Sequence, residues 1–136
     1  MMKKIIIGAC RTGKTYKKVL STILNYTGKI LFISGKDEID YLDIDNLFIK
    51  QKVFDTSGRF NDSIITDWEK TDKNLFIECT TTQECHLIGR LLTETSILDN
   101  DNLLLIIDEG LIILGNIEWD MLSTLADKDA NILIIF

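Results

Sequence analysis

Short apolar runs alternate with longer amphipathic stretches along this chain of 136 residues. The clearest run, Leu103–Ile107, is apolar at every position and lies immediately before Asp108, a pattern typical of a strand covered on both faces. Strands that alternate with helices predict parallel βαβ units, and therefore an α/β fold in three layers, with a mostly parallel sheet and helices on both faces. We expect strands at Lys3–Ile7, Lys29–Ser34, Leu47–Phe54, Asn74–Cys79, Leu103–Ile107 and Asn131–Phe136, helices at Lys14–Tyr26, Asn61–Lys70, Thr81–Leu98 and Ile117–Ala126, and an irregular acidic segment at Asp37–Asp45.

The length and the composition fit one soluble domain that covers residues 1–136. The formal net charge of −6 argues against a surface coated in basic residues that grips nucleic acid alone, although it leaves room for a local basic patch. The three cysteines have no repeating spacing and do not suggest a disulfide framework. Because no apolar stretch reaches the length of a membrane helix and the N-terminus lacks a signal-peptide core, we expect a cytoplasmic protein with no membrane segment.

The segment between the first expected strand and the first expected helix matches the pattern G-x-x-x-x-G-K-[ST] at every defined position. Its glycines let successive backbone N–H groups point at phosphate oxygens, and the following helix adds its positive N-terminal end. In this pattern Lys14 reaches the β- and γ-phosphates, and the Thr15 hydroxyl coordinates Mg²⁺. The predicted phosphate-binding residues are Gly8, Ala9, Cys10, Arg11, Thr12, Gly13, Lys14 and Thr15.

Two carboxylates, Asp108 and Glu109, follow the apolar run 103–107. A carboxylate at the end of a strand can hold Mg²⁺ through water while a loop holds the phosphates. In parallel sheets ligands bind at the carboxyl ends of the strands, which is where both Gly8 and Asp108 fall. Glu78, at the end of another expected strand, is a lesser candidate.

Other residues with chemical potential have simpler structural explanations. Cys79, Cys85 and His86 lie close in sequence, but they are fewer than the four ligands of a structural zinc site and contain no C-x-x-C. Trp68 and Trp119 are expected in the core or at an interface.

With both motifs in place, the chain resembles P-loop ATPases that carry a catalytic glutamate. Among these it is most similar to the FtsK–HerA group of DNA translocases, conjugative coupling ATPases and genome-packaging ATPases. The resemblance implies a RecA-like sheet, ATP and Mg²⁺ as ligands, Asp108 as the residue that holds Mg²⁺, and Glu109 as the general base for hydrolysis. Three local features of this chain carry the resemblance. The first is the loop Gly8–Thr15 with the helix and strand that follow it and the turn Gly35–Glu38. The second is the run Asp108-Glu109-Gly110 before Leu111–Leu114, and the third is the expected helix Ile117–Ala126 before the strand Ile132–Phe136.

The chain departs from this family at its C-terminal end. The family's last strand usually ends in a polar residue that senses the γ-phosphate, and a further strand and often an arginine finger follow, whereas this sequence stops at Phe136. The fold is therefore expected to be short at the C-terminus. Arg59 and Arg90 are the finger candidates outside the loop.

Three functions remain open at this point. The first is an ATPase that moves or packages DNA as a homo-oligomeric ring. The second is a nucleotide-binding switch or regulatory subunit with little hydrolysis, which the short C-terminal end favours. The third is a small nucleoside kinase, because the residues Glu38-Ile39-Asp40 resemble a turn of thymidine kinases, although this chain lacks their zinc-binding cysteines.

Overall fold

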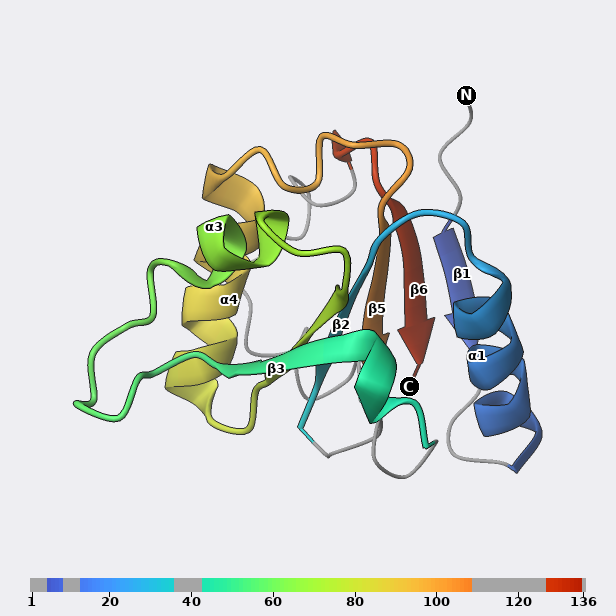
Figure 1. Cartoon of the computed structure of the whole chain (residues 1–136), viewed down its shortest axis with the longest axis horizontal. Helices are drawn as coiled ribbons and strands as arrows, with labels where there is room; N and C mark the ends of the chain where they lie inside the picture. Colours follow the sequence, from blue (N-terminus) through green and yellow to red (C-terminus); the bar gives the residue numbers. More distant parts are fainter. Residues whose placement is uncertain (1–4, 9–12, 36–42, 109–126, 136) are drawn as a thin grey trace.

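The computed structural model describes residues 5–8, 13–35, 43–108 and 127–135 of the chain. The elements are β1 (Ile5–Gly8), α1 (Gly13–Asn25), β2 (Ile30–Ser34), the 3₁₀ turn η1 (Asp45–Leu47), β3 (Phe48–Lys52), α3 (Ile64–Glu69), β4 (Asn74–Glu78), α4 (Thr82–Glu94), β5 (Leu104–Asp108) and β6 (Asn131–Ile135). Each expected apolar run forms a strand, and helices α1, α3 and α4 connect three of the successive strand pairs (Figure 1).

The strands form one six-stranded sheet in the order β1-β6-β5-β2-β4-β3. Every pairing in this sheet is parallel, as the alternation of strands and helices predicts. The order does not follow the sequence, because β6 lies between β1 and β5 and β2 lies between β5 and β4. The expected α/β class with a parallel sheet is therefore confirmed.

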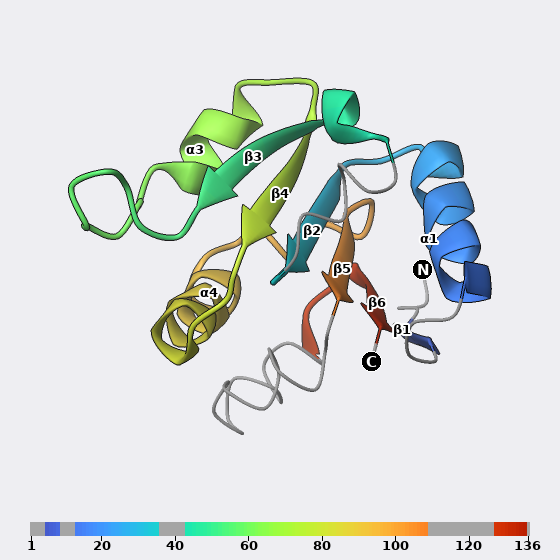
Figure 2. The same ribbon diagram turned by 90° about the horizontal axis from the view of Figure 1, so that it is seen from below.

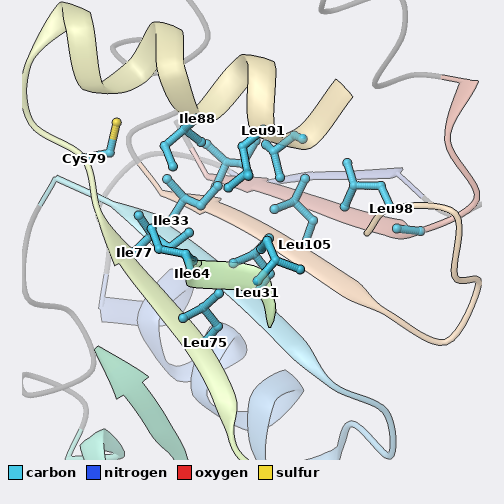
Figure 3. Close-up of a cluster of buried hydrophobic side chains, with 14 of the residues drawn as sticks. Leu31, Ile33, Ile64, Leu75, Ile77, Cys79, Ile88, Leu91, Leu98 and Leu105 are labelled. Atoms are coloured by element: carbon cyan, nitrogen blue, oxygen red, sulfur yellow. The ribbon is translucent and has the colours of Figure 1, made fainter. Parts of the chain in front are cut away.

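Helices cover both faces of the sheet, so that α1 lies on one side and α3 and α4 on the other (Figure 2). On the first face, Val19 and Ile23 of α1 pack in a cluster with Phe32, Phe76 and Ile106 of the central strands. On the second face, the buried side chains of α3 and α4 pack against the alternate residues of the same strands (Figure 3). This second cluster includes Ile64, Ile88, Leu91, Leu31, Ile33, Leu75, Ile77 and Leu105. Burial on both faces explains why the strands are apolar at successive positions.

Several element boundaries differ from the sequence-based expectations. β3 ends at Lys52, before the expected Phe54, because the chain turns back and Phe54 pairs with Phe60 in an isolated antiparallel bridge. The two expected helices that follow are shorter, since α3 covers only Ile64–Glu69 and α4 ends at Glu94. The expected helix Ile117–Ala126 and most of the acidic segment Asp37–Asp45 lie outside the described residues, although Asp45 itself begins η1.

The end of α1 also differs from the expectation. The helix stops at Asn25, and Leu24, which helical spacing places beside the core residues of α1, is 59% exposed. Gly28 follows the helix, but its role is not that of a left-handed helix cap. A Cβ at Gly28 would overlap the carbonyl oxygen of Asn102, so a close approach of two backbone segments requires glycine here.

Candidate functional site

The parallel sheet brings two of the predicted site residues to the same edge. Gly8, the last residue of β1, pairs with Ile135 of β6, and Asp108, the last residue of β5, pairs with the same Ile135. Neighbouring strands lie about 4.8 Å apart, so the backbones of Gly8 and Asp108 are separated by about 10 Å with one strand between them. The start of the predicted loop and the predicted Mg²⁺ carboxylate therefore lie on adjacent parts of the carboxyl edge.

The predicted loop connects this edge to a helix. β1 ends at Gly8 and α1 begins at Gly13, so the expected order of strand, loop and helix is present. Lys14 and Thr15 are the second and third residues of α1, whose first turn leaves backbone N–H groups without intrahelical partners. Such a helix end favours anions through both its N–H groups and its dipole. Ala9, Cys10, Arg11 and Thr12 lie outside the described residues.

Asp108 is 2% exposed although it carries an ionisable carboxyl group. Its Oδ2 accepts a hydrogen bond from the hydroxyl of Ser34, the last residue of β2, over a distance of 3.4 Å. Both side chains are buried at the carboxyl ends of adjacent strands, among residues that are mostly apolar. A buried carboxylate is costly unless polar partners or a cation offset the loss of water, and the Ser34 hydroxyl is one such partner.

Ser34 is a site residue that the sequence analysis did not single out. Its hydroxyl is buried, and its carbonyl oxygen accepts a hydrogen bond of 3.0 Å from the N–H of Cys79. The available signal was its place as the last residue of an apolar strand, next to a glycine. That signal is weak, because the partner carboxylate lies 74 residues away in the sequence.

A row of polar residues continues along the edge beyond Ser34. Ser34 pairs with Glu78 of β4, and Glu78 pairs with Lys52 of β3. Side chains alternate between the two faces of a strand, and Asp108, Ser34, Glu78 and Lys52 all fall on the face that α1 covers. Next to this row is a cavity of about 340 Å³, lined by Lys50, Gln51, Lys52, Phe76 and Glu78.

Glu109, the predicted general base, lies outside the described residues. The two finger candidates are described, and neither belongs to the edge formed by Gly8 and Asp108. Arg59 is exposed in the turn between β3 and α3, and Arg90 forms an exposed ion pair of 3.3 Å with Glu94 on α4. Because α4 covers the face opposite to the Asp108 side chain, Arg90 is not positioned to reach it within the same chain.

Of the remaining sequence candidates, Cys79, Cys85 and Trp68 lie in the core. Cys79 and Cys85 are buried with their sulfur atoms 3.1 Å apart, and His86 follows on α4. The part of the chain that the structure describes contains no group of three or more His, Cys, Asp or Glu residues that could hold a metal ion. Trp68 is a core residue, as expected, and its Nε1–H donates to the carbonyl oxygen of Lys73 at 2.7 Å. Trp119 lies outside the described residues.

In comparisons with known proteins, no protein-family model and no curated protein matches the chain. Among the described helices, none has the length and apolar character that crossing a bilayer requires.

Proposed function

We propose that this protein binds ATP with Mg²⁺ at the carboxyl edge of its sheet, as a P-loop ATPase of RecA-like fold. The observation that carries the proposal is the shared pairing of Gly8 and Asp108 with Ile135. A strand that ends in the G-x-x-x-x-G-K-[ST] loop and a strand that ends in a buried carboxylate flank one common strand.

The separation of the two strand ends suits a phosphate group with its metal ion. Mg²⁺ binds oxygen at about 2.0–2.1 Å and usually keeps several waters, through which a carboxylate can hold it. A gap of about 10 Å between the backbones of Gly8 and Asp108 leaves room for a phosphate on the loop side and a hydrated cation on the Asp108 side. Mg²⁺ bound here would neutralise phosphate charge, and the residues that would hold it are Thr15 and Asp108.

The roles proposed for the individual residues follow from their places in the fold. The backbone of Gly8–Gly13 and the first turn of α1 would bind the β- and γ-phosphates, with Lys14 as a positive charge. Ser34 orients the carboxylate of Asp108 through their hydrogen bond. Glu109, the next residue after β5, is proposed as the base that accepts a proton from the attacking water.

Movement or packaging of DNA by a homo-oligomeric ring is the work that we propose for this ATPase. The support is the similarity of the sequence to the FtsK–HerA group. In such a ring a neighbouring subunit could supply an arginine, such as Arg59, which is exposed. A nucleotide switch that binds ATP with little hydrolysis is the alternative.

A second candidate, a small nucleoside kinase, is favoured by the cavity beside the polar row. Its volume of about 340 Å³ falls in the range of small-molecule sites. Lys50 and Lys52 offer positive charge, and Glu78 offers a carboxylate, on the same face as Asp108. A phosphate acceptor bound in this cavity would lie at the same carboxyl edge of the sheet as the proposed phosphate site, next to β3 and β4.

ATP turnover with and without double-stranded DNA tests these functions. We expect DNA to raise the rate, and we expect Lys14→Ala and Glu109→Gln to abolish turnover. Lys14→Ala should also weaken ATP binding about tenfold or more, because it removes a charge-assisted contact of about 1.5–3 kcal/mol. The matched control is Lys17→Ala, which removes an exposed lysine from the same helix and should change neither quantity.

The outcomes separate the candidates. ATP binding that depends on Lys14 without turnover under any condition would identify a switch. Transfer of the γ-phosphate to a nucleoside, with no effect of DNA, would identify a kinase. Equal ATP affinity of the wild type and Lys14→Ala would contradict the proposed site itself.

A further inference from the structure

The side chains of two buried cysteines, Cys79 and Cys85, contact each other near the first turn of α4. Cys79 follows the last residue of β4, and Cys85 lies in the first turns of α4. Each is 1% exposed, and their sulfur atoms are 3.1 Å apart. Figure 3 shows Cys79 at the margin of the apolar cluster, with its sulfur directed toward α4. A disulfide has a sulfur–sulfur bond of about 2.05 Å, so the two sulfur atoms need to approach by only about 1 Å to form one.

The two thiols are chemically different. The Cys79 thiol donates its hydrogen bond to the sulfur of Cys85. This bond lowers the pKa of Cys85, although burial and the charge of Glu84 oppose the effect. The same bond, followed by burial, raises the pKa of Cys79. Cys85 is therefore the better nucleophile, and Cys79 remains a protonated neighbour.

The surrounding backbone holds the pair in place. The N–H of Cys79 donates to the carbonyl oxygen of Ser34 at 3.0 Å, which fixes the end of β4 against β2. On the other side, Thr81 and Glu84 form a capping box that fixes the first turn of α4. Thr80 and Thr81, in the short segment between the two cysteines, are exposed, so the pair lies directly beneath the protein surface.

We propose that Cys79 and Cys85 form an oxidisable dithiol site that a small hydroperoxide converts into an intramolecular disulfide. The Cys85 thiolate attacks one peroxide oxygen, the O–O bond breaks, and hydroxide leaves, which gives a sulfenic acid on Cys85. The sulfur of Cys79 then attacks the sulfur of Cys85, the S–O bond breaks, and water leaves with the Cys79 proton. Two sulfur atoms lose one electron each, and the peroxide gains both electrons.

The test treats the purified full chain with hydrogen peroxide, blocks the remaining thiols by alkylation and maps tryptic peptides by mass spectrometry. Trypsin cleaves after Lys73 and Arg90, so both cysteines fall on the peptide 74–90, while Cys10 falls on another. We expect this peptide to lose about 2 Da, the mass of two hydrogen atoms, and to regain two alkylated thiols after treatment with a dithiol reductant. The disulfide should raise the unfolding temperature by about 5–10 °C, because it closes a loop in the unfolded chain.

Two matched variants test the order of attack. In Cys79→Ser the reaction should stop at a sulfenic acid on Cys85, which a 1,3-diketone probe labels, whereas Cys85→Ser should label weakly. Two free thiols on the wild-type peptide 74–90 after oxidation, or a link from it to the Cys10 peptide or to a second chain, would overturn the proposal. This wild-type measurement needs no variant to fold and no nucleotide to bind, so it stands or fails independently of the proposed ATPase function.

Discussion

Asp108 combines a carboxyl group with almost complete burial, at 2% exposure. Burial of a carboxylate is costly, and the hydrogen bond from Ser34 offsets part of that cost. Asp108→Asn keeps the size of the side chain and an oxygen that can accept from Ser34, but it removes the charge. We expect this variant to lose Mg²⁺-dependent ATP affinity about tenfold or more, while its free energy of unfolding changes by less than about 1 kcal/mol.

Titration calorimetry with and without Mg²⁺, together with urea unfolding, measures both quantities for Asp108→Asn. Asp101→Asn is the control, because Asp101 is exposed in the turn before β5, at the opposite end of that strand. It should bind Mg·ATP as the wild type does. A large loss of stability with unchanged affinity would show instead that Asp108 is a structural residue.

At the scale of residues, the sequence predicts those parts of the candidate site that belong to a local pattern. The glycines, Lys14 and Thr15 stand at fixed spacing, and Asp108 follows an unbroken apolar run, so each was identifiable without the fold. Ser34 was not, because a serine at a strand end has no distinctive neighbours in the sequence. Its relation to Asp108 exists only because β2 and β5 pair in the sheet.

The start of α4 gives a prediction at the scale of elements. The Thr81 side chain accepts from the N–H of Glu84, and Glu84 accepts from the N–H of Thr81. Partial burial raises the pKa of Glu84, but hydrogen bonds from Thr81 and Thr80 outweigh it, so the pKa is lowered overall. A lowered folded-state pKa means that the carboxylate stabilises the fold above its unfolded pKa of about 4.3 and that this contribution is lost as pH falls through the folded value.

Glu84→Gln should therefore unfold more easily than the wild type at pH 7, by about 0.3–1 kcal/mol, the usual contribution of a charge near an exposed helix N-terminus. The difference should shrink as pH falls below about 4, where the wild-type carboxylate becomes protonated. Urea unfolding at several pH values measures it. Glu94→Gln is the control, because Glu94 ends the same helix, where the dipole does not favour a negative charge, and its ion pair with Arg90 is exposed and contributes little. A difference that is independent of pH would refute this account of the cap.

Element type was predictable here because the central strands β2 and β5 are buried on both faces and the long helices on one. Runs such as Leu103–Ile107 and Asn74–Cys79 have no solvent face that could make them ambiguous with loops. The ends of strands were less predictable where apolar residues continue past the last residue that pairs with a neighbouring strand. Val53 is fully buried but lies beyond β3, and Phe54 contributes to an antiparallel bridge, so the apolar pattern extended the expected strand too far.

For the whole molecule, the parallel sheet separates two edges with different roles. The carboxyl edge contains Gly8, Asp108 and the polar row. At the amino edge, the segments that lead into the strands contact one another directly. At the amino edge the Tyr26 hydroxyl donates to the carbonyl oxygen of Asn102 at 2.9 Å and accepts from the side chain of Asn131 at 3.3 Å. Local periodicity could not predict this division, because it depends on the order of the strands.

Gly28 lies at the amino edge, where an added Cβ would overlap the carbonyl oxygen of Asn102. Gly28→Ala must push these two backbone segments apart, and we expect it to lower the free energy of unfolding by about 1–3 kcal/mol, the usual cost of overpacking. Its affinity for Mg·ATP, measured by calorimetry below the unfolding transition, should stay equal to that of the wild type.

Gly58→Ala is the comparison for a glycine with open space around it, since any loss of stability there comes from its positive φ of 82° rather than from a clash. Asp108→Asn should show the reverse pattern to Gly28→Ala, with affinity lost and stability kept. If Gly28→Ala also weakened nucleotide binding in the folded protein, the two edges would be coupled through the strands, and the carboxyl edge could not be treated as a separate site.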